Sequence, residues 1–317
     1  MSLRPDHAFA SPSRLPKVVC VLVALAVGGV IYATSANFAG GRTVVLGRTW
    51  PATDFVSIET IDHRDWDRLL QRYVSESGEV GYSDWQRAPA DVEALDAYLG
   101  SLSRANPDLP AGREARLAFW INAYNALTIR QILTDYAAPT IPGQTVPRSG
   151  VNLGSAFWLR VGGRRFSLAQ IEHQVLRPLR EPRIHFAIVC GARGCPRLLN
   201  RAYQSNNLEQ QLRDNSRSFF ADPQKLEFDS ATGQLRLSPI LKWYADDFGG
   251  SQSQMLEQII PYLPDRVTGQ LPDKRRLRTE YLDYDWSLND QTPANSDAPV
   301  PPSAPPADAD ETPLEHK

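Results

Sequence analysis

The segment from Arg113 to Tyr136 constrains the fold most. It reads REARLAFWINAYNALTIRQILTDY, and between Leu117 and Leu127 its apolar residues occur on every side of a helix instead of along one stripe. A helix that is apolar all round must be covered by protein on every side. The sequence therefore predicts a central helix buried among several other elements.

Helical and hairpin patterns alternate along the rest of the chain. Amphipathic or capped stretches on both sides of the central segment predict further helices, one of them starting at Ser167. Pairs of extended stretches flank Gly162 and Gly233, and each pair predicts a β-hairpin. No series of parallel crossovers is visible. We therefore predict an α+β fold, in which an antiparallel sheet with hairpins packs against several helices, including the buried central one.

The composition limits the classes of function. At 317 residues and 42% hydrophobic content, the chain is long enough to bury a substantial core. Its formal net charge of -2 at pH 7 provides no positive field for nucleic acid, and no DNA-binding or RNA-binding motif is visible. We therefore expect no nucleic-acid partner. The sequence gives no indication of the oligomeric state.

An apolar segment near the N-terminus predicts export. Arg4, Arg14 and Lys17 precede the uncharged residues 18–33, and small residues follow. This order is typical of an export signal whose basic end stays in the cytoplasm. About 16 apolar residues span only roughly 24 Å as a helix, so an uncleaved anchor and a cleaved leader both stay open. We expect a protein anchored in the inner membrane and facing the periplasm, or one secreted to the periplasm after cleavage.

Changes in composition divide the chain into four parts. Residues 1–36 form the cytoplasmic N-terminus and the signal or anchor segment, and residues 37–59 form a connector. Residues 60–290 carry the helical and hairpin patterns and form the globular domain. Residues 291–317 are rich in proline and acidic residues and cannot form a core.

Candidate chemistry gathers in RIHFAIVCGARGCPRL, residues 183–198, which holds His185, Cys190 and Cys195. Residues 184–189 are apolar enough for a buried strand, which would place His185 and Cys190 on opposite faces. Cys195 is followed by Pro196 and is predicted at the N-cap of a helix, where amides and the helix dipole lower a thiol pKa. Cys195 is therefore the candidate nucleophile, and His185 is its candidate base.

Three segments together resemble a known family. They are LAFWINAYNALTIRQIL, RIHFAIVCGARGCPRL and LRLSPILKWYADDF, and in this order and spacing they resemble bacterial members of domain-of-unknown-function family 547, DUF547. The resemblance covers roughly residues 60–290. It implies that the two cysteines, the histidine and two asparagines form a shared centre, but it implies no particular activity.

The two cysteines allow three interpretations: a disulfide, a reactive thiol or a zinc site. Cys190 and Cys195 are the only cysteines outside the apolar N-terminal segment, and an exported protein can join them in a disulfide. Closing a loop of about six residues would stabilise the fold by roughly 2 kcal/mol. A disulfide and a reactive thiol are compatible, since the oxidised pair can be the resting form of the thiol. Zinc is disfavoured, because the spacing H-x4-C-x4-C lacks a CxxC pair. We expect no metal and no other cofactor.

Polar residues within apolar helices add to the candidate site. Asn122 and Asn125 lie one turn apart on the central helix, and buried carboxamides need specific hydrogen-bond partners. They either tie the helix to neighbouring backbone, or orient His185 and stabilise an oxyanion. Glu172 is predicted to face inward, where it orients His185 or forms an ordinary salt bridge. A possible pocket is formed by Tyr124, Lys242, Trp243 and Tyr244.

Two functions follow from these residues. In the first, the protein is a thiol-dependent hydrolase or acyltransferase that acts on peptide or envelope amides. Cys195 attacks the acyl carbon, His185 takes and returns the proton, and Asn122 or Asn125 stabilises the oxyanion. In the second, the protein is a noncatalytic envelope binding or scaffold module, in which the Cys190–Cys195 disulfide is structural.

Overall fold

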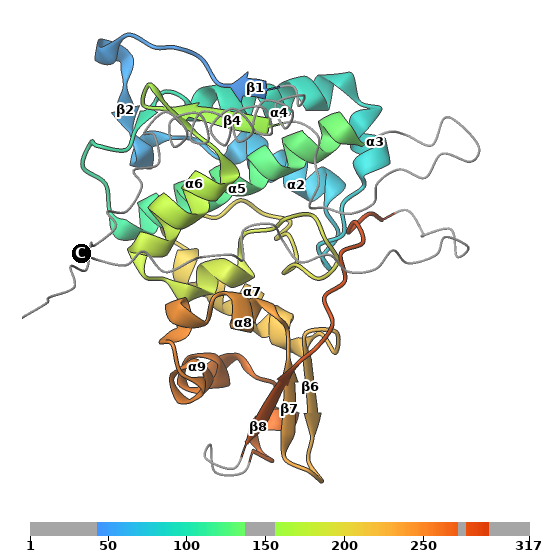
Figure 1. Ribbon diagram of the computed structural model, residues 1–317. Helices are drawn as coiled ribbons and strands as arrows, with labels where there is room; N and C mark the ends of the chain where they lie inside the picture. The colour runs from blue at the N-terminus through green and yellow to red at the C-terminus, as the bar shows by residue number, and fades with distance from the viewer. Residues whose placement is uncertain (1–42, 137–155, 272–276, 292–317) are drawn as a thin grey trace, which may run out of the picture. The chain divides into compact units, whose positions relative to one another are not determined.

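The computed structural model describes residues 43–136, 156–271 and 277–291, which belong to one compact unit that begins at Thr43 (Figure 1). The predicted export segment and the proline-rich tail from residue 292 onward lie outside these residues. Among the helices of the described ranges, none is long and apolar enough to cross a membrane. The predictions of an anchor and of an envelope location therefore stay predictions.

The predicted central helix is confirmed. It is α5, Arg113–Asp135, and every residue from Leu117 to Ile129 is buried. Helices α3 (Tyr82–Gln86) and α4 (Pro89–Leu102) pack against one side of it, and α2 (Arg64–Tyr73) packs against both of these helices. On another side lies α6 (Leu168–Gln170), which continues as a π-helical turn, Ile171–Leu176, and a 3-10 turn, Arg177–Leu179 (Figure 1). The apolar circumference of α5 thus has neighbours on several sides, as its sequence requires.

The strands form three small mixed sheets instead of one antiparallel sheet. Both predicted hairpins are present and antiparallel, while the strands that join them from elsewhere in the chain pair in parallel. The first sheet has the order β1 (Thr43–Leu46), β4 (Ala156–Val161) and β5 (Arg164–Phe166). The second pairs β2 (Val56–Ser57) with β3 (Ala105–Asn106), and the third has the order β6 (Leu226–Asp229), β7 (Gln234–Leu237) and β8 (Arg278–Tyr281). The α+β class is confirmed.

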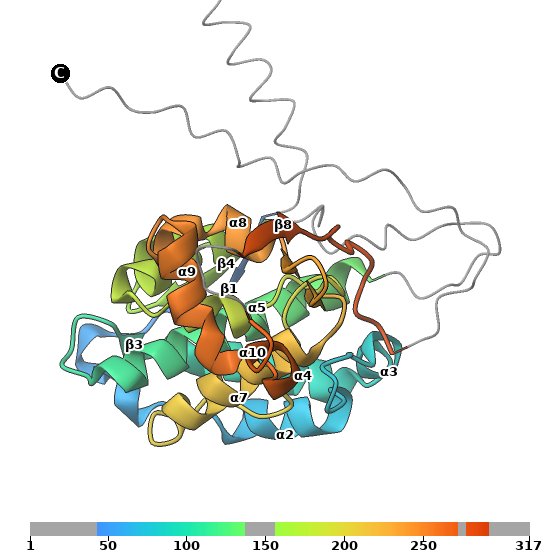
Figure 2. The ribbon, with the colours of Figure 1, turned by 90° about the horizontal axis from the view of Figure 1, so that it is seen from below.

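A second hydrophobic core lies between the third sheet and the C-terminal helices. Phe186, Phe219 and Phe248 are among its buried members. The elements around it include α7 (Leu208–Ala221), α8 (Ile240–Trp243), α9 (Gln252–Ile259) and α10 (Asp265–Thr268), which Figure 2 shows from below. Because Phe186 precedes the cysteines by a few residues, this core fixes one end of the cysteine segment.

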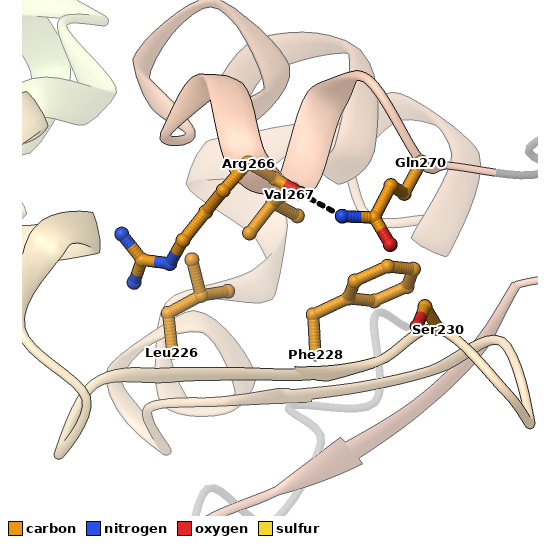
Figure 3. Close-up of a pocket in the computed structure, with 6 residues that line it drawn as sticks. All are labelled: Leu226, Phe228, Ser230, Arg266, Val267 and Gln270. Carbon is orange, nitrogen blue, oxygen red and sulfur yellow. Dashed lines mark hydrogen bonds between the residues drawn. The ribbon is translucent and has the colours of Figure 1, made fainter.

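A small pocket of about 170 Å³ opens between β6 and α10 (Figure 3). Inside it, the Gln270 side-chain amide donates to the carbonyl of Arg266 at 2.9 Å. Its lining residues are Leu226, Phe228, Ser230, Arg266, Val267 and Gln270. None of the six is a histidine, a cysteine or a carboxylate, so this pocket lies outside the candidate chemistry.

Two local predictions around the cysteines are wrong. Residues 184–189 do not form a strand: a 3-10 helix spans Pro182–Phe186, and irregular backbone follows. No helix begins at Cys195 either, because the next helix starts at Leu208. In both places, side chains or other loops bind the backbone groups that a strand or a helix would have paired. The apolar composition of residues 184–189 and the proline at 196 therefore did not predict regular structure correctly.

His63 is a buried histidine outside the cysteine segment. It lies just before α2, is 8% exposed, and its Nδ1 is 2.8 Å from the Tyr98 hydroxyl. Burial lowers the pKa of His63 from 6.5 to about 4, and the charge of Asp62 opposes this only in part. The folded protein therefore holds this ring neutral.

This buried ring predicts acid sensitivity. The pKa of His63 is lower in the folded state than in the unfolded state, so its contribution to stability is full above about pH 6.5 and is lost as the pH falls toward 4. Relative to His63→Gln, the wild type should lose about 3 kcal/mol of unfolding free energy between pH 7 and pH 4. Urea unfolding of both proteins across this range measures the difference, and parallel pH curves would contradict the assignment.

Candidate functional site

Carboxamides of α5 hold the backbone before and after the two cysteines. Asn125 donates through Nδ2 to the carbonyl of Ala187 at 2.9 Å and accepts through Oδ1 from the amide of Val189 at 3.0 Å. Asn122 makes the same pair of bonds with Tyr203, at 2.8 and 2.9 Å. Each side chain thus acts as a substitute strand partner, which explains why buried amides occur on an otherwise apolar helix.

The C-terminal segment holds the loop between the two cysteines. The amide of Arg193 donates to the carbonyl of Ser287 at 2.7 Å, and the amide of Gly194 donates to that of Asp285 at 2.7 Å. Gly194 lies against Tyr284, and a Cβ atom at this position would come within 2.7 Å of the ring. The loop therefore requires glycine at 194, because the aromatic ring occupies the space of a side chain.

Cys190 and Cys195 form a disulfide, with their Cα atoms 6.3 Å apart. The disulfide predicted as one of the alternatives is therefore present in the structure. The Cys195 sulfur is within hydrogen-bond distance of two donors: the Cys190 amide at 3.0 Å and the Tyr284 hydroxyl at 3.1 Å. The same hydroxyl is 3.5 Å from the Cys190 sulfur. Both donors would also stabilise a Cys195 thiolate.

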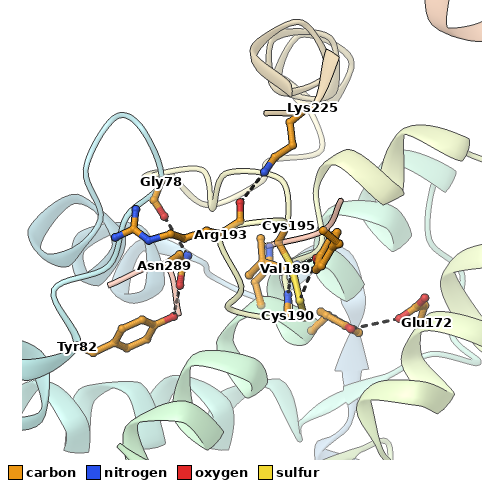
Figure 4. The surroundings of a disulfide bond; sticks show 12 residues. Gly78, Tyr82, Glu172, Val189, Cys190, Arg193, Cys195, Lys225 and Asn289 are labelled. Atoms are coloured by element: carbon orange, nitrogen blue, oxygen red, sulfur yellow. Dashed lines mark hydrogen bonds between the residues drawn. A yellow bond between two sulfur atoms is a disulfide. The ribbon is translucent and has the colours of Figure 1, made fainter. Parts of the chain in front are cut away.

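Cys195 lines a pocket of about 360 Å³. The pocket has cationic and anionic groups, namely Arg193, Arg197, Lys225, Glu79 and Asp222. Lys225 is buried, donates to the carbonyl of Arg193 at 2.5 Å, and lies 3.8 Å from Asp222. Burial lowers the pKa of Lys225. Arg193 and Lys225 lie on one side of the disulfide and Glu172 on the other (Figure 4).

His185 is paired with a carboxylate. Its Nε2 lies 2.6 Å from Asp247 Oδ2, and its ring stacks on Tyr244 with 3.8 Å between the centroids. Arg177 binds both oxygens of the same carboxylate, at 2.7 and 3.2 Å. The ring is 2% exposed. Within the described ranges, the hydrogen-bond partner of the ring is Asp247 and not a sulfur atom.

The charge of Asp247 fixes the histidine tautomer. Burial alone would raise the pKa of Asp247, but hydrogen bonds from His185 and Arg177 hold this pKa below its usual value. An ionised carboxylate only accepts hydrogen bonds, so Nε2 of His185 carries the hydrogen. In the neutral ring, Nδ1 is then the basic nitrogen. The histidine and the aspartate are 62 residues apart, and no spacing in the sequence predicted this pair.

Glu172 lies among phenols beside the disulfide. It is buried, and its Oε2 accepts from the Tyr124 hydroxyl at 3.2 Å. Burial, followed by the charge of Glu172, raises the pKa of Tyr124 and of Tyr244. Tyr284 adds to both shifts, so the three hydroxyls and the carboxylate share one neighbourhood. Tyr284 itself has a pKa raised by burial and stays a hydrogen-bond donor at neutral pH.

The four predicted pocket residues differ in exposure. Tyr124 and Tyr244 lie in the phenol group near the disulfide, whereas Trp243 is 39% exposed and Lys242 is exposed beside it. Trp243 packs on Tyr284, with centroids 4.9 Å apart, and helps to hold that ring in place. Tyr284 was not predicted as a site residue. Its contact with Cys195 spans 89 positions.

Comparison with known families identifies part of this unit. The model of a family described as "Protein of unknown function, DUF547" matches residues 109–220, so the chain contains a DUF547 domain there. The matched range includes α5, the cysteine loop and nearly all of α7. Searches of curated proteins and of solved structures found no match. In the part of the chain that the structure covers, no three His, Cys, Asp or Glu side chains are grouped to hold a metal ion.

The Asn125 contacts predict a large effect of a small substitution. In Asn125→Ala, the carbonyl of Ala187 and the amide of Val189 lose their partner in a buried position, which should lower the free energy of unfolding by about 3 kcal/mol. Gln210→Ala removes an exposed helical carboxamide, which binds Asp214, and should cost less than about 0.5 kcal/mol. Urea unfolding compares the two. Equal small losses would show that the Asn125 bonds are dispensable.

Proposed function

We propose that the protein is a thiol-dependent hydrolase or acyltransferase whose nucleophile is Cys195, with the disulfide as its resting form. The place of Cys195 carries this proposal: the residue lines the 360 Å³ pocket, and its sulfur is near two hydrogen-bond donors. A thiol reacts as the thiolate, and donors aimed at sulfur favour that form. These contacts replace the helix N-terminus that the sequence predicted there.

The proposed reaction begins with the reduced pair. The Cys195 thiolate attacks an acyl carbon in the pocket, and the proton needed by the leaving group comes from an acid–base residue. His185 is the proposed base, since Asp247 and Tyr244 fix its ring and leave Nδ1 as the basic nitrogen. Asn122 and Asn125 act in this scheme as positioning residues, because both of their amide groups bind backbone.

Peptide or other envelope amides are the proposed substrates. The pocket presents both cationic and anionic side chains, which suits a polar chain with amide groups better than an apolar ligand. The export segment predicted at residues 18–33 would bring the domain to that compartment and attach it to the membrane if it is not cleaved.

A structural role for the disulfide is the second candidate. Two observations favour it: the bond is closed, and Cys195 is only 6% exposed. In that case the protein is a noncatalytic binding or scaffold module, and the bond stabilises its loop.

Alkylation separates the two candidates. Full-length protein is treated with iodoacetamide at pH 7, with and without prior mild reduction, and labelled sites are mapped by peptide mass spectrometry. The enzyme proposal predicts no label at either loop cysteine before reduction, and rapid labelling of native Cys195 after it. In Cys190→Ser, the pH dependence of the Cys195 rate should give a thiol pKa below the usual value of about 8.5.

The same experiment includes its own control. Urea-denatured, reduced protein gives the labelling rate of the unprotected thiols. If Cys195 reacts only after denaturation, the disulfide is a structural link and the enzyme proposal fails.

A further inference from the structure

The two sulfur atoms of the disulfide have different surroundings. Cys195 Sγ is near the Cys190 amide and the Tyr284 hydroxyl, at 3.0 and 3.1 Å, whereas the contact of Cys190 Sγ with Tyr284 is longer, at 3.5 Å. The charges of the pocket beside Cys195 add little, because Glu79 pairs with Arg193 and Asp222 with Lys225. The two hydrogen-bond donors therefore carry the difference between the sulfur atoms. Negative charge that develops on sulfur is therefore better stabilised at Cys195 than at Cys190.

The two cysteines also differ in access. Cys195 is 6% exposed and lies under Tyr284, while Cys190 is partly exposed. Thiol–disulfide exchange needs a thiolate to reach one sulfur from the side opposite to the sulfur that leaves, and the better stabilised sulfur leaves faster. The greater exposure of the Cys190 residue and the better leaving ability of Cys195 Sγ thus favour the same direction of attack.

We propose that an external thiol opens the disulfide in one direction, by attacking Cys190 and releasing Cys195 as the free thiolate. This inference rests on the proposed function, because it identifies how the working thiol becomes available. It names the class of partner that must act first: a thiol reductant, and preferably one with two thiols. The oxidised protein must then undergo a thiol–disulfide exchange before it can transfer acyl groups.

The exchange balances in two steps. In the first, the thiolate of the reductant forms a bond with Cys190 Sγ, the Cys190–Cys195 bond breaks, and its electron pair stays on Cys195 Sγ. In the second, another thiol of the reductant attacks the mixed disulfide and releases Cys190. The reductant leaves as a disulfide, and the protein has gained two electrons. Cys190 takes up one proton, and Cys195 takes up a second only when its thiolate is protonated.

The experiment traps the first step in the full-length oxidised protein. A monothiol, 2-mercaptoethanol, is added for increasing times, free thiols are blocked with N-ethylmaleimide, and the products are mapped by tandem mass spectrometry. We expect the mercaptoethanol adduct on Cys190 and the maleimide on Cys195, in a ratio of at least about ten to one. Adducts mainly on Cys195, equal labelling, or resistance of the native disulfide to the thiol would each overturn the inference.

A pair of tyrosine variants tests the cause of the direction. Tyr284→Phe removes the hydroxyl at the leaving sulfur and should slow reduction about fivefold, the effect of one hydrogen bond. Tyr281→Phe removes an exposed hydroxyl from the same segment and should leave the rate unchanged. If Tyr284→Phe is reduced as fast as the wild type, leaving-group stabilisation by Tyr284 is wrong.

The outcomes separate this inference from the proposed function. Cys190→Ser presents Cys195 as a free thiol without any reduction, so its alkylation tests the nucleophile alone. A reactive Cys195 in that variant, together with adducts on the wrong sulfur in the wild type, would overturn the direction of opening and leave the thiol enzyme proposal standing.

Discussion

Buried backbone without regular structure must find hydrogen-bond partners elsewhere, and this requirement governs the centre of the protein. Residues 187–195 form neither strand nor helix, yet most of them are buried. Asn125 binds the backbone before Cys190, and Ser287 and Asp285 bind the backbone of the loop. The cost of burying unpaired amides and carbonyls is thus avoided, and the cysteines are held at fixed positions.

These contacts connect fold to chemistry. Because α5 is buried all round, its carboxamides face the cysteine segment in a fixed orientation. The C-terminal segment supplies Tyr284, whose ring lies against Gly194 and whose hydroxyl lies 3.1 Å from the Cys195 sulfur. The pair of donors at this sulfur is therefore a consequence of packing. The proposed thiol chemistry and the proposed direction of disulfide opening both use this asymmetry.

The sequence predicted the elements that depend on local residue patterns, namely the central helix and the two hairpins. The apolar circumference of α5 and the glycines of both hairpins are local signals, and the structure confirms these elements. The pair of His185 with Asp247 and the contact of Tyr284 with Cys195 join residues 62 and 89 positions apart, and they depend on tertiary packing that no spacing encodes. The predicted strand and the predicted N-cap were wrong for the same reason, since distant groups bind that backbone.

The central claim is that hydrogen bonds, and not the disulfide, hold the cysteine loop in place. Amide hydrogen exchange at Val189, Arg193 and Gly194, measured by NMR in the oxidised and the reduced protein, tests it most directly. We predict that all three amides keep their protection after reduction, within about tenfold, because their acceptors lie on α5 and on the C-terminal segment. Exchange of these amides at the rate of an unstructured loop after reduction would contradict the claim.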